Sequence, residues 1–104
     1  MSNACVVMTT VANAEQARMI MTAVVEARLA ACAQTQGISS CYRWDGKVVS
    51  EDEQLIVFKT MSDAYEALEV KLLALHPYDT PEIIRLPIES GSAKYLAWIA
   101  SEVG

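Results

Sequence analysis

The chain has 104 residues, which is room for one hydrophobic core, so we expect residues 1–104 to form a single domain. Its 53% hydrophobic residues exclude a disordered chain, and its net charge of −5 opposes binding to a phosphate backbone, so no nucleic-acid partner is expected. The first residues carry neither a basic stretch nor an apolar run long enough for a signal or a membrane span, which predicts a cytoplasmic protein without a membrane partner.

The first part of the chain predicts a strand, a helix and a second strand. A β-branched apolar run at residues 4–10 is typical of a buried strand. Asn13 then has the side chain of a helix N-cap, with Gln16 as its capping-box partner. At residues 32–44 the apolar period changes to two, which predicts a strand, and Gly37 within it predicts a bend or a bulge.

The dipeptide Asp45-Gly46 is the strongest short hairpin signal in the chain. A two-residue hairpin turn needs positive φ at both central positions, which Asp and Gly tolerate at low cost. We therefore expect the chain to return antiparallel through residues 47–60.

The last part of the chain predicts helix, strand and helix. Ser62 is the expected N-cap of a helix that ends near His76, because Pro77 disfavours the α conformation at the residue before it. Residues 82–88 predict a fourth strand, whose proline favours a sheet edge. Ser92 can cap a closing helix.

These elements predict an α+β fold of the ferredoxin-like type. The order β-α-β-β-α-β with right-handed crossovers puts two helices on one face of a four-stranded antiparallel sheet, with a long hairpin and an added C-terminal helix. The other face still carries apolar residues such as Val7 and Val57. Because no second helix layer covers them, the pattern predicts association through the sheets.

Six short motifs follow one another in an order that resembles the CutA family, the divalent-cation tolerance proteins, from about Thr9 to Val103. They are Leu29-Ala30-Ala31-Cys32, Tyr42-Arg43-Trp44-Asp45-Gly46-Lys47, Glu51-Asp52-Glu53, Lys59-Thr60, His76-Pro77-Tyr78-Asp79-Thr80-Pro81-Glu82 and Tyr95-Leu96-Ala97-Trp98-Ile99. The resemblance implies a homotrimer related in architecture to the PII signalling proteins. It also implies a role in tolerance of copper and other divalent metals, with no established reaction.

One hypothesis for the site is a metal centre. His76 is the only histidine, and with the carboxylates of Asp79 and Glu82 it offers a mixed donor set that suits Cu(II) or Zn(II). We take His76 and Asp79 as candidate ligands of copper or another divalent cation. Some copper-binding relatives have a cysteine where this chain has Thr9 and a further histidine where it has Leu75, so only His76 carries over from them.

A second hypothesis is a PII-like sensor that binds an unknown small molecule in a cleft between subunits. Aromatic walls, one cation and convergent carboxylates are the expected makeup of such a cleft, and the chain offers Trp44, Tyr78, Lys59, Glu53 and Glu82. The alternative is structural: Lys59 forms an ion pair with one of the two glutamates, and the aromatic rings are interface anchors.

A third hypothesis is a small enzyme that uses Cys41, His76 and a carboxylate. The sequence has no nucleophile elbow and no phosphate-binding loop, and only four glycines, so we predict that the protein is not an enzyme. The three cysteines form no C-x-x-C pair, which predicts reduced structural thiols.

Overall fold

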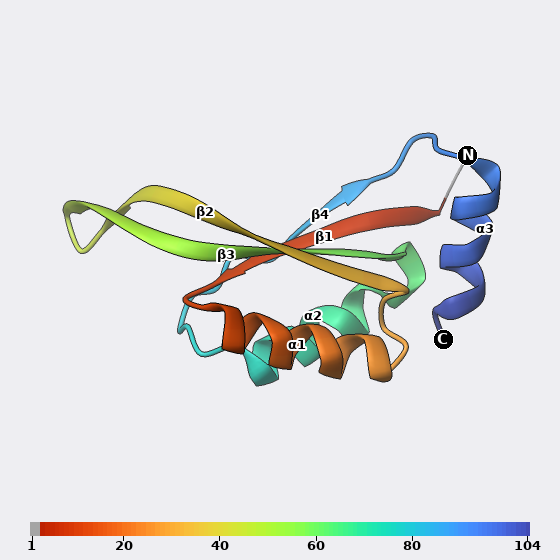
Figure 1. Cartoon of the computed structure of the whole chain (residues 1–104), viewed down its shortest axis with the longest axis horizontal. Coiled ribbons are helices and arrows are strands. Elements are labelled where there is room, and N and C mark those ends of the chain that lie inside the picture. Colours follow the sequence, from red (N-terminus) through yellow and green to blue (C-terminus); the bar gives the residue numbers. More distant parts are fainter. Residues whose placement is uncertain (1–2) are drawn as a thin grey trace.

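The computed structural model of the protein, which describes residues 3–104, contains one antiparallel sheet of four strands in the order β2-β3-β1-β4 (Figure 1). The strands are β1 (Ala4–Val11), β2 (Cys32–Trp44), β3 (Lys47–Met61) and β4 (Ile84–Pro87). The helices are α1 (Ala14–Glu26), α2 (Tyr65–Leu75) and α3 (Ala93–Glu102). Helices α1 and α2 lie on one side of the sheet and α3 lies at one end, which confirms the predicted ferredoxin-like α+β arrangement.

Helix α1 begins where its capping residues predict. The Asn13 side chain accepts a hydrogen bond from the Gln16 backbone N–H at 2.9 Å, and the Gln16 side chain accepts one from the Ala12 N–H at 3.1 Å. Two N–H groups at the helix start are thereby satisfied. One face of the helix is fully buried on the sheet through Ala17, Ile20 and Val24.

Helix α2 starts differently from the prediction and ends as predicted. Ser62 is not its N-cap: it begins a short 3-10 turn, η1 (Ser62–Ala64), and no side chain caps α2. Met61 has the extended conformation of the N-cap position, with φ −109° and ψ 148°, so Ser62 already lies inside the turn, where its side chain does not cap α2. The Ser62 N–H donates to the carbonyl of Asn3 at 2.7 Å. At the other end His76 is extended, with φ −72° and ψ 132°, as the following Pro77 requires.

The hairpin between β2 and β3 closes through the predicted two-residue turn. Asp45 has φ 52° and Gly46 has φ 75°, so both central positions have the positive φ that such a turn demands. Trp44 pairs with Lys47, and the ladder continues without interruption to the pair of Cys32 with Lys59. The hairpin therefore fixes the pairing of the two longest strands.

The prediction of a bend or bulge at Gly37 is wrong. Gly37 pairs with Gln54, while Gln36 and Ile38 on either side pair with the adjacent residues of β3. A Cβ atom at Gly37 would lie 3.5 Å from the Gln54 side chain, which is ordinary contact. Neither the backbone path nor the available space requires a glycine here.

The core lies between the sheet and helices α1 and α2. Its buried members are Cys5, Val7, Val11, Ala17, Ile20, Val24, Ala30, Ile56, Phe58, Leu68 and Leu72. Val7 pairs with Phe58 on the helix side, so its predicted position on the uncovered face is wrong. Because successive residues of a strand alternate between faces, the next pair, Met8 with Val57, points to the uncovered face, as predicted for Val57.

Strand β4 is an edge strand, as its proline predicts, and its four residues are exposed. It is shorter than the predicted residues 82–88, because β1 pairs with it only from Met8 with Ile84 to Cys5 with Pro87. Ile84 and Leu86 are 43% and 50% exposed. Together with Val57, they give the uncovered face and its edge an apolar surface.

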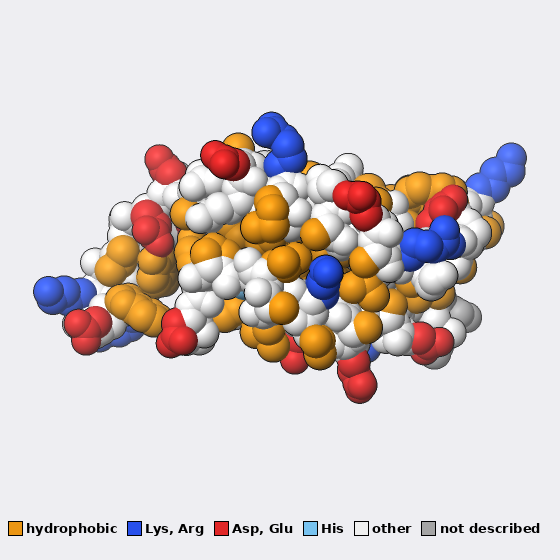
Figure 2. Space-filling model, turned by 90° about the horizontal axis from the view of Figure 1, so that it is seen from below, with side chains coloured by type: hydrophobic (Ala, Val, Ile, Leu, Met, Phe, Trp, Pro, Cys, Tyr) orange, Lys and Arg blue, Asp and Glu red, His pale blue; other side chains and the backbone are white. Residues whose placement is uncertain are grey.

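The helix-covered side has a mixed surface. Figure 2 shows the molecule from the side on which α1 and α2 lie in Figure 1, with hydrophobic side chains among charged groups of both signs. Met19, Val70 and Leu73 are among the exposed hydrophobic residues of these two helices. Within residues 3–104, none of the helices has the length and apolar character needed to cross a membrane.

Two glycine substitutions test the account of the hairpin. We expect Gly46→Ala to lower the free energy of unfolding by about 1 kcal/mol, because an L side chain is strained at φ 75°. Gly37→Ala is the matched control in the same hairpin and should change it by less than about 0.5 kcal/mol. Urea denaturation at one protein concentration measures both, and equal losses would contradict the assignment of strain to the turn.

Candidate functional site

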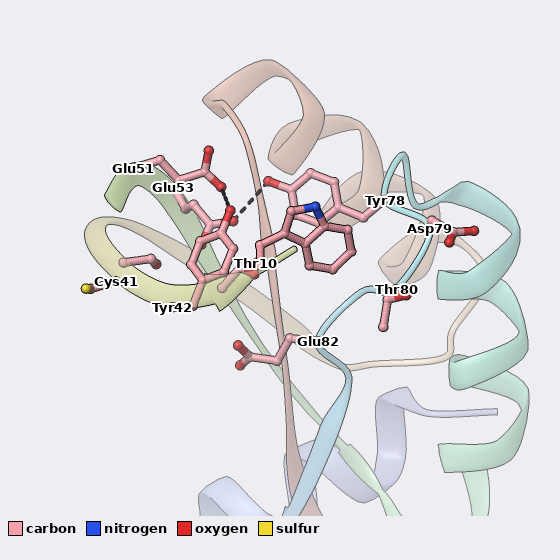
Figure 3. Close-up of a pocket in the computed structure, with 11 residues that line it drawn as sticks. Thr10, Cys41, Tyr42, Glu51, Glu53, Tyr78, Asp79, Thr80 and Glu82 are labelled. Atoms are coloured by element: carbon pink, nitrogen blue, oxygen red, sulfur yellow. Dashed lines mark hydrogen bonds between the residues drawn. The ribbon is translucent and has the colours of Figure 1, made fainter. Parts of the chain in front are cut away.

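A cleft of about 540 Å³ lies where the β2–β3 hairpin meets the end of β1 and the segment that follows α2 (Figure 3). Its aromatic and acidic lining residues are Tyr42, Trp44 and Tyr78, and Glu51, Glu53, Asp79 and Glu82. Small residues complete the lining: Thr10, Ser40, Cys41 and Thr80. The lining includes four carboxylates and no lysine or arginine.

The hairpin register brings the strand residues of this cleft to one face. Ser40 pairs with Glu51 and Ile38 pairs with Glu53, so both glutamates point to the same side of the sheet as Tyr42. That side is the one opposite to helices α1 and α2. The segment after α2 approaches it from beyond the end of β1, with Pro77 and Pro81 restricting the backbone on either side of Tyr78.

Two phenol–carboxylate hydrogen bonds organise the cleft. The Tyr78 hydroxyl donates to Glu53 Oε2 at 2.9 Å, and the Tyr42 hydroxyl donates to Glu51, as the dashed lines in Figure 3 indicate. Burial and the hydrogen bond to Glu53 raise the pKa of Tyr78, and the hydrogen bond to Glu51 raises the pKa of Tyr42 to about 12. Both phenols are therefore protonated near neutral pH and act as donors.

Glu53 is the most enclosed acid of the cleft. Only 7% of its surface is exposed, whereas Glu51 and Glu82 are exposed. Its hydrogen-bond donor is the Tyr78 phenol, a neutral group. This enclosed carboxylate therefore has a neutral donor as its partner, and the lining places no lysine or arginine beside it.

His76 is 9% exposed and is hydrogen-bonded to the backbone of two residues of the cleft lining, Thr10 and Tyr78. Its Nδ1 accepts a hydrogen bond from the Tyr78 N–H at 3.1 Å, so the neutral ring carries its proton on Nε2. Nε2 donates to the carbonyl of Thr10 at 2.9 Å and lies 3.1 Å from the Thr9 hydroxyl. The ring thus connects the end of β1 to the segment that carries Tyr78.

The environment of His76 favours its neutral form. Burial lowers its pKa, while the hydrogen bond to Thr10 and the charge of Glu53 act in the opposite direction and are smaller. A proton on Nδ1 would also place two donors, Nδ1–H and the Tyr78 N–H, against each other. His76 is therefore a positioning residue for the cleft in its neutral form.

A metal centre does not fit these residues in a single chain. Both ring nitrogens of His76 already have hydrogen-bond partners. Asp79 is exposed, and Figure 3 shows its carboxylate directed away from those of Glu51, Glu53 and Glu82. Across residues 3–104, no group of three or more His, Cys, Asp or Glu side chains is placed to hold a metal ion. The assignment of His76 and Asp79 as ligands stays a prediction.

The predicted small-ligand residues are largely together. Trp44, Glu53, Tyr78 and Glu82 all line the cleft. Lys59 is not in its lining: it lies on β3 and donates a hydrogen bond to Gln34 on the neighbouring strand. Within the chain, Lys59 therefore has the Gln34 amide as its partner and does not form the suggested ion pair with Glu53 or Glu82.

Sequence reasoning missed Tyr42, Glu51 and Thr10 as lining residues. The signal for the first two was present, because an Asp45-Gly46 turn pairs position 40 with position 51 and so puts Tyr42 and Glu51 on one face. Nothing local signals Thr10, whose position depends on the pairing of β1 with β3.

The three cysteines are free thiols, with Cys5 buried and Cys41 exposed at the cleft.

The phenol–carboxylate bonds generate a prediction for stability. Tyr78→Phe leaves the enclosed Glu53 without its donor, so we expect a loss of about 1–2 kcal/mol in the free energy of unfolding. Tyr42→Phe is the matched control, because it removes the same kind of bond from the exposed Glu51 and should change stability little. Urea denaturation measures both variants, and an equal effect would contradict the enclosed character of Glu53.

The lowered pKa of His76 generates a prediction for pH dependence. The unfolded chain takes up a proton as pH falls below the ordinary value of 6.5, before the folded chain does, so the free energy of unfolding should fall from pH 7 to pH 5.5. His76→Gln lacks this titration, so its stability curve should be flatter over the same range. Denaturation at several pH values tests this, and parallel curves for the two proteins would exclude His76 as the cause.

Comparisons with known proteins agree with this fold. The family model described as "CutA1 divalent ion tolerance protein" matches residues 5–102. A divalent-cation tolerance protein CutA from Thermus thermophilus is 46% identical over 100 residues, covering 95% of this chain and 97% of that protein. A chloroplastic protein CutA from Arabidopsis thaliana is 44% identical over 90% of this chain, which spans only 52% of the plant protein.

A solved structure shares the whole architecture. The structure of the periplasmic divalent cation tolerance protein CutA from Archaeoglobus fulgidus superposes with a TM-score of 0.94 at 32% identity, covering 97% of this chain and 99% of that chain. The family model, the identities to curated relatives and this superposition agree over nearly all residues. The chain belongs to the CutA1 family of divalent-ion tolerance proteins.

Proposed function

We propose that this protein acts in divalent-cation tolerance as a non-enzymatic binding or signalling protein, and that it binds a cation in the acidic cleft. The observation that carries the proposal is the composition of the lining, with four carboxylates, three aromatic rings and no basic side chain. Cations are attracted to such a site both by the carboxylates and by the faces of the rings.

Comparison with another hollow of the described residues supports the choice of the cleft as the cation site. This other hollow is lined by Ser62, Asp63, Tyr65, Glu66, Glu69 and Arg85 and is also acidic. There the Arg85 guanidinium lies 5.3 Å from the centre of the Tyr65 ring, so a built-in cation already occupies the aromatic face. The cleft has no such internal cation and is the better candidate for an external one.

The carboxylates of the cleft limit which small molecules the sensor hypothesis allows. A PII-like sensor of a small molecule in an inter-subunit cleft remains our alternative, with Trp44, Glu53, Tyr78 and Glu82 as binding residues. The carboxylates disfavour an anionic ligand such as a nucleotide, because like charges would repel inside a half-enclosed cleft. The sensed molecule in this alternative is therefore cationic or neutral.

We propose copper as the specific metal, on the basis of the family resemblance and of one contact. The Thr9 hydroxyl lies 3.1 Å from His76 Nε2, at the position where some copper-binding relatives have a cysteine. A hydroxyl does not replace a thiolate as a soft ligand, so a copper ion here would bind weakly. The acidic cleft is the stronger candidate for contact with divalent cations.

We also propose that the protein is a homotrimer in the cytoplasm. The support for association is the sheet face opposite to α1 and α2, where Met8 and Val57 pair, and the exposed apolar edge formed by Ile84 and Leu86. An apolar surface of this kind is typical of an interface between copies of a chain. The trimeric number comes from the family resemblance.

Equilibrium dialysis with Cu(II), Zn(II) and Mg(II) tests the proposed function. We expect saturable binding of at least one of these cations to the wild-type protein and a weakening of at least about tenfold in Glu53→Gln. Glu66→Gln is the matched control, because Glu66 is an exposed carboxylate outside the cleft. Loss of binding in Asp79→Asn with retention in Glu53→Gln would favour the site at His76 and Asp79 instead. No saturable binding of any of the three would overturn direct metal binding.

A further inference from the structure

We propose that helix α3 is a strap that opens from the rest of the chain as a separate unit, and that the Arg28 side chain is the latch that keeps it closed. Arg28 lies just after α1, and its side chain is hydrogen-bonded to the last turn of α3 and to Gly104. Three features lead to this inference: the backbone conformation of Arg28, its bonds to the end of α3, and the small buried surface of α3.

The first feature is that Arg28 has a backbone conformation typical of glycine. Its φ is 60°. Its N–H donates to the Val25 carbonyl at 3.0 Å, and the Leu29 N–H donates to the Val24 carbonyl at 3.2 Å, which is the pattern of a helix that ends at a left-handed residue. Glycine adopts this conformation without strain, whereas an L side chain is strained there. The end of α1 therefore does not require an arginine, and the side chain has another role.

The second feature is that the Arg28 side chain joins the ends of two helices. Its Nε donates to the Gly104 backbone oxygen at 3.1 Å, and its Nη2 donates to the Ser101 carbonyl in the last turn of α3 at 3.2 Å. In return, the Gly104 N–H donates to the Arg28 carbonyl at 2.9 Å. The last turns of α1 (Ala14–Glu26) and α3 (Ala93–Glu102) contain no basic residue, so the Arg28 guanidinium supplies favourable positive charge where both helices end.

The third feature is that α3 buries little of its own surface. It has 10 residues, and a helix this short is marginal in water without tertiary packing. Of residues 93–102 only Ile99 is fully buried, and Ile99 is not part of the core cluster between the sheet and helices α1 and α2. Tyr95 and Trp98 stack on each other and remain 42% and 41% exposed. An element with so few buried contacts can open locally while the rest of a fold stays intact.

Opening of α3 changes the sheet face opposite to α1 and α2. Cys32 pairs with Lys59, so its side chain points to the same face as Val57, and the Tyr95 hydroxyl contacts Cys32 there. Helix α3 also packs against β1 and β3 at this end of the sheet (Figure 1). The closed strap therefore covers one end of the face that carries Met8 and Val57, and its release enlarges the exposed part of that face.

Amide hydrogen exchange of the full chain, followed by mass spectrometry, tests the inference. In the wild-type protein we expect the α3 amides to be at least about tenfold less protected than the α1 amides that exchange by global unfolding. This difference is the direct sign that α3 opens by itself. Equal protection in the two helices would overturn the inference.

Arg28→Gly separates the latch from the helix end. It keeps the left-handed conformation, relieves the strain and removes the side-chain hydrogen bonds. The strain is relieved in the open and closed states of α3 alike, so exchange in α3 should become at least about fivefold faster. For global unfolding the relief offsets the lost bonds, so exchange in α1 should change by less than about twofold. An equal rise in both helices would mean only a general loss of stability and would contradict the latch.

Two further variants serve as control and as second test. Arg18→Ala removes the same charge from an exposed position of α1 and should change exchange in α3 by less than about twofold. Gly104→Ala alters the other side of the latch, because Gly104 has φ 105°, which an L side chain rarely adopts. It should speed exchange in α3 by at least about threefold alone and leave it unchanged when added to Arg28→Gly, where the contact is already lost. Full additivity of these two changes would overturn the pairing of Arg28 with Gly104.

Tryptophan emission gives an independent signal from α3. In a Trp44→Phe variant, Trp98 is the remaining tryptophan of the chain and lies on α3. When Arg28→Gly is added, the urea transition followed by Trp98 emission should begin at a lower concentration than the one followed by far-ultraviolet circular dichroism. Coincident transitions in this double variant would show that α3 and the core unfold together, against the inference.

Discussion

The pairing of β2 with β3 is the constraint on which the rest of the structure depends. One tight turn with positive φ at Asp45 and Gly46 sets the partners of every residue in the hairpin. Because side chains alternate between faces, a shift by one residue would move Glu51 and Glu53 to the other face of the sheet. The acidic character of the cleft is therefore a consequence of the turn.

The apolar sheet face and the acidic cleft are both open because α1 and α2 lie on the other side of the sheet. Helices α1 and α2 both lie on the same side of the sheet, so the side chains of the opposite side either remain open or meet segments from elsewhere in the chain. Near Met8 and Val57 the open side is apolar, and beyond the end of β1 it becomes acidic and aromatic. The proposed association and the proposed ligand binding therefore both involve the side of the sheet opposite to α1 and α2.

His76 shows how a lone histidine can act without binding a ligand. It uses one ring nitrogen as a donor to Thr10 and the other as an acceptor from Tyr78, so it joins two segments that are far apart in the sequence. Because the Tyr78 hydroxyl donates to the buried Glu53, the position of His76 also affects this carboxylate. In a family named for divalent-cation tolerance, this makes the histidine part of the support of an acidic cleft.

The sequence by itself determined the order of elements, the α+β class and the place of the hairpin turn, because these depend on local signals: the apolar period, the caps and the positive φ of Asp45-Gly46. From the makeup expected of a small-ligand cleft it also grouped Trp44, Glu53, Tyr78 and Glu82, which the structure brings into one lining, although their role as binding residues stays a prediction. Local signals were insufficient at Gly37, which pairs regularly within the strand ladder, and at Ser62, which lies inside the turn after Met61. Only the tertiary structure decided that Val7 faces the helices, that Lys59 lies away from the cleft and that both nitrogens of His76 have partners within the chain. Those outcomes depend on contacts between residues distant in sequence, and no local pattern specifies which of them form.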